Sequence, residues 1–307
     1  MSETKTRKYS LSDFFANYFS NFGRLLLVNL MFSVPLAVFV GGIVAYTYFK
    51  GEMSWFIVLL IIPLMSPFFA GLTNVCRKLT AYKKFNPIKD YFGGIKSNWL
   101  FFLVNSILLY ALSVGLMFIV MLRRQSDSGA VVMYMVIMLL SVALFLFMEL
   151  SALVMSVTLD IGFSDVIKNS MVMVVKGFFN HLKTIFGLMF VAFIVYSVLA
   201  LINQMIPVLI VSGVLTVTVL PAMIMYIISY NSYQTIEKHI ILPYSKEVQM
   251  EKQAKLEKEK EDAMTIQELE PLSKGDPDEY ILFNGKTVKR KVILQMIEVR
   301  KNGNTDQ

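Results

Sequence analysis

The chain of 307 residues is 56% hydrophobic, with 24 Phe, 20 Met and a mean hydropathy of +0.60, which excludes an ordinary soluble globular protein. Its formal net charge of +7 comes from cations at the ends of apolar runs, a placement that favours anionic lipid headgroups over nucleic acid as their partner. The single cysteine, Cys76, excludes an internal disulfide and any multi-cysteine metal site.

The first predicted element is an amphipathic helix over residues 10–22. Its apolar face carries Leu11, Phe14 and Tyr18, while polar residues occupy the other face, a pattern typical of a helix in the membrane interface. Residues 25–49 then follow without a charge, and a run of 25 residues is long enough to span the hydrocarbon core. The sequence therefore predicts an in-plane helix that leads into a spanning helix.

Charge-free runs predict the spans, and these runs are 25–49, 53–76, 97–122, 128–148 and 184–236. The last run is too long for one span, so we divide it near its middle, at Asn203, Gln204 and Pro207, and expect six spans. Small residues at every fourth position predict faces for close helix packing; these residues are Ala37, Gly41 and Ala45 in the first span and Ala111 and Gly115 in the third. Four prolines predict kinks within spans: Pro35, Pro63, Pro67 and Pro221.

The placement of Lys and Arg predicts the orientation of the spans. With the N-terminus inside, fourteen of these cations flank the spans on the cytoplasmic side, and only Lys50, Arg123 and Arg124 lie in outer loops. By the positive-inside rule, both termini are expected in the cytoplasm.

The N-terminal unit is repeated along the chain. A shift of 77 residues aligns Asp13 with Asp90 and Asn21 with Asn98, and Asp165 follows Asp90 by 75 residues. Any interfacial helix before a span would show part of this pattern, but the matching aspartates and asparagines favour duplication. We expect an all-α polytopic membrane domain over residues 1–242. Its three units, each an interfacial helix plus a helical hairpin, cover about 11–80, 88–158 and 164–238.

Residues 243–307 form a charged cytoplasmic tail. Charge runs predict a solvated helix over 246–262, followed by a linker around Pro271. Tyr280–Phe283 and Lys286–Lys289 flank an Asn-Gly pair, which predicts a hairpin with a type I′ turn, and a last short helix follows. About 25 residues is too few for an independent core, so we expect this segment to dock on the membrane domain or on a partner.

The motifs of enzymes are absent from the sequence: there is no HExxH, Walker A, GxGxxG or serine-nucleophile pattern. The two histidines, His181 and His239, stand at span ends, where placement among headgroups is expected. We therefore predict no enzyme activity, no catalytic residues, no cofactor and no metal.

Glu149 is the only acidic residue deep within a span. It lies ~16 Å from Asp160 along the helix, near the middle of a core ~30 Å thick. By the same counting, four hydroxyl side chains share its depth: Ser33, Ser66, Tyr110 and Tyr226. Asn29, Asn105 and Asn231 form a shallower polar layer. The carboxyl could hold helices together through such hydroxyls, or it could be a proton- or substrate-responsive site.

Three stretches resemble the YesL family of bacterial multi-pass membrane proteins: FGRLLLVNLMFSVP at 22–35, FGGIKSNWLFFLVNSILL at 92–109 and VIKNSMVMVVKGFFNHLKTIFGL at 166–188. The resemblance covers roughly residues 10–240 and leaves the tail outside. It implies a bacterial cytoplasmic membrane location and a role near carbohydrate uptake, but it carries no site residues, because the family is a domain of unknown function.

Three functions follow as hypotheses. The first is a protein that assists or regulates solute transport, plausibly of carbohydrate, with a sugar transport system or another membrane protein as its partner. The second is a membrane scaffold or signalling partner that acts through its tail and interfacial helices. The third is a self-sufficient transporter. A continuous polar cavity would favour transport, whereas a dry bundle with an ordered tail would favour the scaffold.

Overall fold

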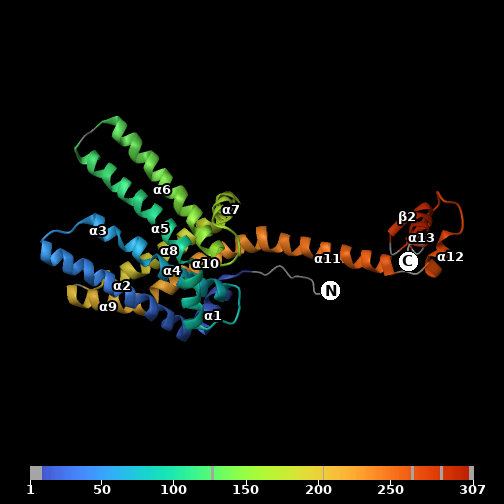
Figure 1. The fold of residues 1–307 in the computed structure, drawn as a ribbon. Coiled ribbons are helices and arrows are strands. Elements are labelled where there is room, and N and C mark those ends of the chain that lie inside the picture. The colour runs from blue at the N-terminus through green and yellow to red at the C-terminus, as the bar shows by residue number, and fades with distance from the viewer. Residues whose placement is uncertain (1–8, 126–127, 203, 264–265, 284–285, 304–307) are drawn as a thin grey trace. The chain divides into compact units, whose positions relative to one another are not determined.

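The computed structural model describes residues 9–125, 128–202, 204–263, 266–283 and 286–303. The chain is almost entirely α-helical and divides into two compact units, Met1–His239 and Ile240–Gln307 (Figure 1). Each unit is described by itself.

The first unit contains the helices that could cross a membrane. Among the described residues, five are long and apolar enough: α2 (Phe22–Lys50), α3 with α4 (Trp55–Leu59 and Ile61–Thr80), α5 (Pro87–Gln125), α6 (Gly129–Ser156) and α8 (Phe178–Ala200). A sixth candidate is a pair bent by 47°, formed by α9 (Met205–Thr218) and the helical segment that begins at Leu220 with α10 (Leu220–Ile236). The chain is thus a multi-pass membrane protein by the length and apolarity of its helices.

Short amphipathic helices precede two of the long ones. The Oγ of Ser10 accepts a hydrogen bond from the backbone N–H of Asp13 at 3.1 Å and so caps α1 (Leu11–Ser20). The helix α7 (Phe163–Lys176) precedes α8, and the single residue Gly177 separates them. The second predicted interfacial helix differs, because residues 87–125 form one continuous helix of 39 residues without the expected break. A helix can run on here because no residue after Pro87 interrupts its hydrogen bonding.

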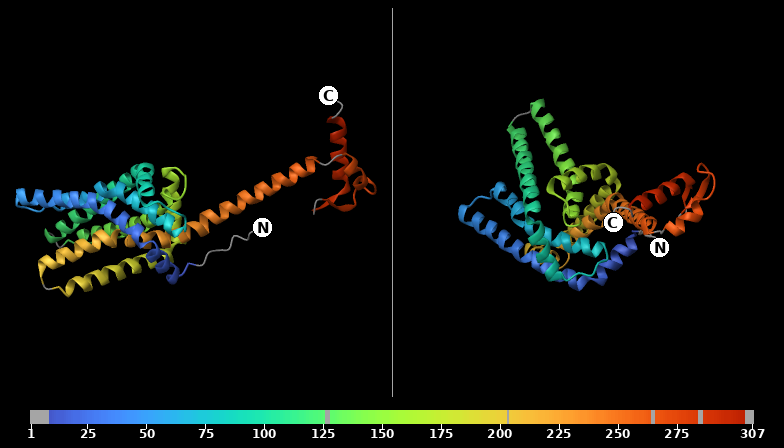
Figure 2. Two further views of the ribbon diagram at one scale, coloured as in Figure 1. Left: turned by 90° about the horizontal axis from the view of Figure 1, so that it is seen from below. Right: turned by 45° about the vertical axis from the view of Figure 1, so that its right-hand side comes forward.

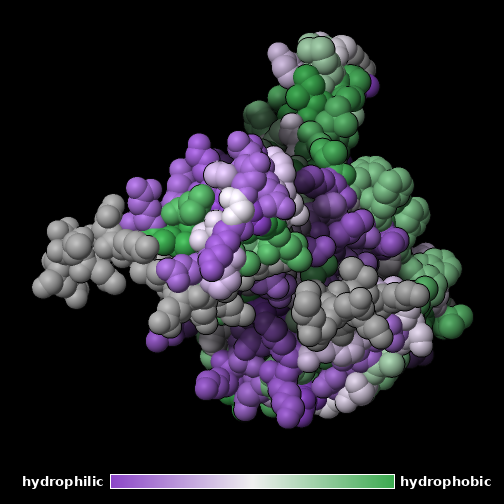
Figure 3. Space-filling view, turned by 90° about the vertical axis from the view of Figure 1, so that its right-hand side faces the viewer, coloured by the Kyte–Doolittle hydropathy of each residue, from purple (hydrophilic) through white to green (hydrophobic). Residues whose placement is uncertain are grey.

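Buried residues are concentrated at one end of this unit, where α10 lies at the centre and packs against α2, α4, α6 and α8. We call this end the base; it comprises α1, α7, α10 and the adjoining parts of the longer helices. The remaining parts, the outer halves, diverge: the hairpin of α5 and α6 leans away from that of α2 and α3 (Figures 1 and 2). In Figure 3 the hairpin of α5 and α6 projects at the top with a largely hydrophobic surface.

Glycines set the closest helix contact at the base. A Cβ atom on Gly71 would lie 2.7 Å from the carbonyl oxygen of Tyr91, and one on Gly94 would lie 2.7 Å from the Cβ of Asn74. The backbones of α4 and α5 therefore approach where neither helix has room for a side chain. The predicted packing face on α2 is not used in this way, because nothing lies within 4 Å of a Cβ built on Gly41.

The second unit begins near the predicted start of the tail. It contains α11 (Leu242–Ala263), α12 (Ile266–Ser273), the antiparallel strands β1 (Tyr280–Phe283) and β2 (Lys286–Lys289), and α13 (Arg290–Gly303). A π-helical turn, Glu237–Ile241, precedes α11. Strand register pairs Tyr280 with Lys289, as the predicted hairpin requires, whereas the predicted turn at 284–285 lies outside the described residues.

The tail has a small hydrophobic core of its own, formed by Leu269, Phe283, Ile293 and Ile297. The prediction of a segment without a core is wrong because it treated the region around Pro271 as a linker. That region is the helix α12, which contains Pro271 and contributes Leu269 to the core.

Candidate functional site

Glu149 is buried on α6, with 8% of its surface exposed, and its Oε1 has no hydrogen-bond partner among the described residues. The expected hydroxyl partners are engaged elsewhere. Ser66 donates to the carbonyl oxygen of Pro63 at 2.8 Å, and Ser33 donates to that of Thr216 at 3.4 Å.

The two tyrosines predicted at this depth also do not reach Glu149. The hydroxyl of Tyr226 accepts a hydrogen bond from Nδ2 of Asn17 at 3.1 Å, and the half-buried Tyr110 has no hydrogen-bond partner in the described chain. Counting residues gives the depth of a side chain but not the direction in which its helix turns it. The predicted network of Glu149 with four hydroxyls is therefore absent from the described structure.

Instead, neighbouring helices place other unpaired polar atoms near the depth of Glu149. Ser232 on α10 donates to the carbonyl oxygen of Leu150 at 2.6 Å, which fixes α10 against α6 beside Glu149. One turn away on α10, the Oγ of Ser229 is buried without a partner.

Phe102 of α5 packs with Leu153 and Val157 near the end of α6. One turn farther from the base on each helix stand Asn105 and Glu149, and the Asn105 amide is also buried without a partner. This buried polar layer holds one ionisable group, and the described residues contain no cluster of His, Cys, Asp or Glu that could hold a metal ion.

The break between α9 and α10 is closed by side chains from the start of the chain. Asn29 of α2 donates from Nδ2 to the carbonyl oxygen of Thr218 at 2.8 Å, and its Oδ1 accepts from the N–H of Ala222 at 2.8 Å. The hydroxyl of Tyr18 donates to the carbonyl oxygen of Val219 at 3.3 Å. The backbone groups exposed by the break are therefore satisfied within the protein, as a membrane interior requires.

His181 is fully buried in the base, contrary to the expectation that it lies among headgroups. Its Nε2 lies 3.2 Å from the Oγ of Ser151 and 3.2 Å from the carbonyl oxygen of Met173. These contacts join α6, α7 and α8. The expectation failed because α7 and α10 cover the start of α8, which the sequence of α8 alone does not reveal.

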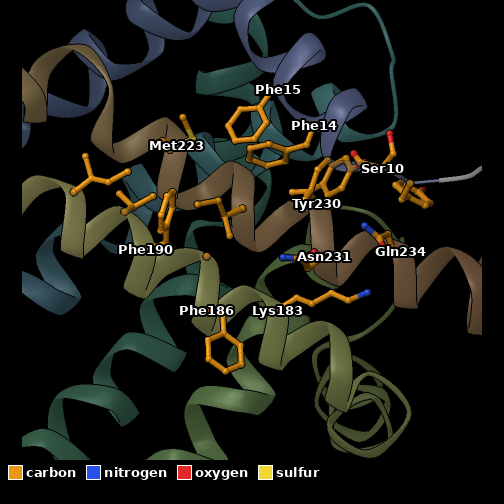
Figure 4. Close-up of a pocket in the computed structure, with 16 residues that line it drawn as sticks. Ser10, Phe14, Phe15, Lys183, Phe186, Phe190, Met223, Tyr230, Asn231 and Gln234 are labelled. Atoms are coloured by element: carbon orange, nitrogen blue, oxygen red, sulfur yellow. The ribbon is translucent and has the colours of Figure 1, made fainter.

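A groove of about 800 Å³ lies between α1, α8 and α10 and was not predicted from the sequence (Figure 4). From α1 and the residues before it, Tyr9, Ser10, Leu11, Phe14 and Phe15 line it. From α8 the lining residues are Lys183, Phe186, Gly187, Phe190, Val191 and Ile194. From α10 they are Met223, Ile227, Tyr230, Asn231 and Gln234. No local sequence pattern marks this groove, because it is formed by helices from both ends of the first unit.

No family model, curated protein or solved structure matches this chain.

Proposed function

We propose that the chain is an accessory protein of a solute-transport system in the bacterial cytoplasmic membrane, with carbohydrate as the solute, as its resemblance to the YesL family implies. The carrying observation is that buried residues are concentrated at the base, whereas the outer halves bury few side chains. In the outer half, α9 has no buried residue, and in α8 only His181 and Thr184 are buried. Apolar helices left uncovered by their own chain are available to lipid and to helices of a partner.

The proposal includes the arrangement of the spans: three units of an interfacial helix and a hairpin, six spans, and both termini in the cytoplasm. The cation distribution supports it, and so do α1 and α7 ahead of their long helices. Reporter fusions after Lys50, Arg124 and Gln204 should report an external site, and fusions after Lys83 and Lys168 an internal one. A reversed signal at two of these positions would refute the orientation.

Independent transport by this chain is less well supported. Broken helices in transporters present free backbone groups to substrates, but the break between α9 and α10 is closed by Asn29 and Tyr18. A second cavity, of about 310 Å³ between α5 and α6, has only Tyr134 with a polar atom among its lining side chains. Its other lining side chains are Phe118, Ile119, Leu122, Val131, Ile137 and Met138.

The second candidate function, a membrane scaffold or signalling partner, is favoured by the tail. Leu269, Phe283, Ile293 and Ile297 give the tail a core of its own, so its surface is ordered and available to a cytoplasmic protein. In this alternative the membrane unit serves mainly as an anchor.

Uptake measurements can separate these functions. Deletion of the gene should reduce the uptake of a carbohydrate from a radiolabelled panel, and the full chain should restore it. A variant that stops after residue 242 should also restore uptake if the outer halves of the membrane unit contact the transporter, but not if the tail does. Purified protein in proteoliposomes should take up none of the sugars. Uptake by the purified protein would contradict the accessory role, and so would unchanged uptake after gene deletion.

Site-specific photo-crosslinking then tests where the partner lies. A photoreactive residue at Val38 or Val44, both exposed on the outer half of α2, should form an adduct with a membrane subunit of the transporter. A photoreactive residue that replaces Tyr244 in the tail serves as the comparison. Adducts at Tyr244 alone would favour the scaffold.

A further inference from the structure

We propose that the groove between α1, α8 and α10 binds one phospholipid with an anionic headgroup, taken from the leaflet on the side of the base. This inference needs only a membrane location and is independent of a role in transport. It rests on how polar and apolar side chains are ordered along the groove (Figure 4).

Polarity changes along the groove in the direction of membrane depth. On α8, Lys183 lies nearest the base, and Phe190 and Ile194 follow farther from it. On the antiparallel α10, Gln234 lies at the same end of the groove as Lys183, and Met223 lies at the opposite end. From Lys183 to Ile194 the helix rises ~16 Å, about half the thickness of a ~30 Å hydrocarbon core. The groove is therefore as deep as one leaflet and matches the polarity of a lipid.

The polar end has hydrogen-bonding capacity that the described residues do not use. Asn231 and Gln234 point into the groove and form no side-chain hydrogen bond with the described part of the chain. Lys183 has no carboxylate partner there, and its Nζ has one long contact, 3.4 Å to the Oδ1 of Asn180. One cation beside two amides is suited to a phosphate group, which accepts several hydrogen bonds and carries the complementary charge.

The apolar part of the groove has a closed floor and an open wall. A Cβ on Gly187 would lie 3.1 Å from Cγ2 of Ile227, so α8 and α10 meet at the floor. Phe186 and Phe190 are each 61% exposed and form the wall. An acyl chain along this wall would cover both rings. A partner helix would cover them too, but it would not account for a single charged end.

Native mass spectrometry of the full chain in mild detergent tests the proposal. Delipidated protein is titrated with phosphatidylglycerol, with phosphatidylcholine of the same acyl chains, and with inorganic phosphate. Each chain should bind one molecule of phosphatidylglycerol. Lys183→Gln should raise the dissociation constant of this lipid about tenfold, as expected for loss of one charge-assisted hydrogen bond. Lys168→Gln removes the same charge from an exposed position on α7, outside the groove, and should leave binding unchanged.

Val191→Trp places a large ring in the apolar part and should also weaken phosphatidylglycerol binding, which distinguishes a bound lipid from a bound headgroup. Thermal unfolding confirms that each variant folds. Equal binding of phosphatidylcholine, or an equal loss in Lys168→Gln, would overturn the proposal in favour of unspecific lipid adsorption. Inorganic phosphate that competes at similar concentration would identify a free-anion site instead. If Lys183→Gln and Val191→Trp both bind phosphatidylglycerol as the unaltered chain does, the lipid does not bind in the groove and the proposal is refuted in favour of a protein partner at this site.

Discussion

The base and the outer halves of the membrane unit share several long helices but differ in how they are stabilised. In α10, at the centre of the base, twelve of seventeen residues are buried, whereas α9, which continues the same bent pair into the outer half, has none buried. The base joins its helices through side chains that satisfy backbone groups of other helices. In the outer halves, lipid is as apolar as the side chains, so apolarity alone gives no drive to associate.

The largest effect is expected at the closure of the broken helix. Asn29→Leu leaves the carbonyl oxygen of Thr218 and the N–H of Ala222 buried without a partner, which should lower the free energy of unfolding by about 4 kcal/mol. Unfolding is followed by circular dichroism during titration of mixed micelles with SDS. Asn98→Leu is the control, because the Asn98 amide bonds only to its own helix, at Gly94. Equal losses in both variants would show that the closure adds no stability.

A pair of glycine substitutions compares the base with an outer half directly. Gly94→Ala places a methyl group 2.7 Å from the Cβ of Asn74 and 2.9 Å from the carbonyl oxygen of Ala70, so α4 and α5 must separate. We expect a loss of about 2 kcal/mol in the same titration. Gly41→Ala meets no atom within 4 Å and should be neutral or slightly stabilising, because alanine favours helix. A loss at Gly41 as large as at Gly94 would mean that the outer halves are packed after all.

A smaller effect is expected for the tyrosine hydroxyls. Tyr226→Phe removes the hydroxyl that accepts a hydrogen bond from Asn17, which should cost about 1 kcal/mol of unfolding free energy. The Asn17 amide keeps its second bond, 2.8 Å to the carbonyl oxygen of Leu79, which limits the loss. Tyr110→Phe should have no effect, because its hydroxyl has no partner in the described chain. A measurable loss at Tyr110 would reveal a contact made by lipid or by a second protein.

The smallest effect is expected at Glu149. No hydrogen bond to its carboxyl is present among the described residues, so Glu149→Gln should change the unfolding free energy by less than about 0.5 kcal/mol. Glu149→Leu should be neutral or stabilising, because it removes a buried polar group that has no partner. If Glu149→Leu destabilises the protein and Glu149→Gln does not, the Glu149 carboxyl has a structural role and forms hydrogen bonds with groups outside the described residues.

The sequence predicted the structural features that depend on a single helix or hairpin. Charge-free runs located the long helices, the division of the fifth run falls between Ala200 and Met205, and Pro221 marks the bend. Alternation and turn residues located Tyr280–Phe283 and its partner strand. Local hydrogen bonding and apolarity along the chain are sufficient for these features.

Features that depend on helix rotation could not be predicted from the sequence. Depth counting grouped Glu149 with Ser66 and Tyr226, but their bonds go to other groups because each helix turns them differently. The spacing of small residues marked Gly41, where a Cβ atom would meet nothing within 4 Å, and Gly115, where it would meet Met138 of α6 at 2.6 Å. It did not mark Gly94, where the backbones of α4 and α5 approach each other. The groove beside Lys183 needs three helices from both ends of the chain, and no local pattern shows that they meet.

The closure of the α9–α10 break also has a consequence for biogenesis. Asn29 and Tyr18 leave the ribosome long before the groups that they bond, which lie at residues 218–222, about 190 to 200 positions later in the chain. Until the last bent pair is inserted, these early side chains lack their final acceptors. That pair in turn enters the membrane with unpaired backbone groups until it meets them. Assembly of the base therefore needs the α9–α10 pair, and nascent chains shortened within α9 should remain open to membrane proteases.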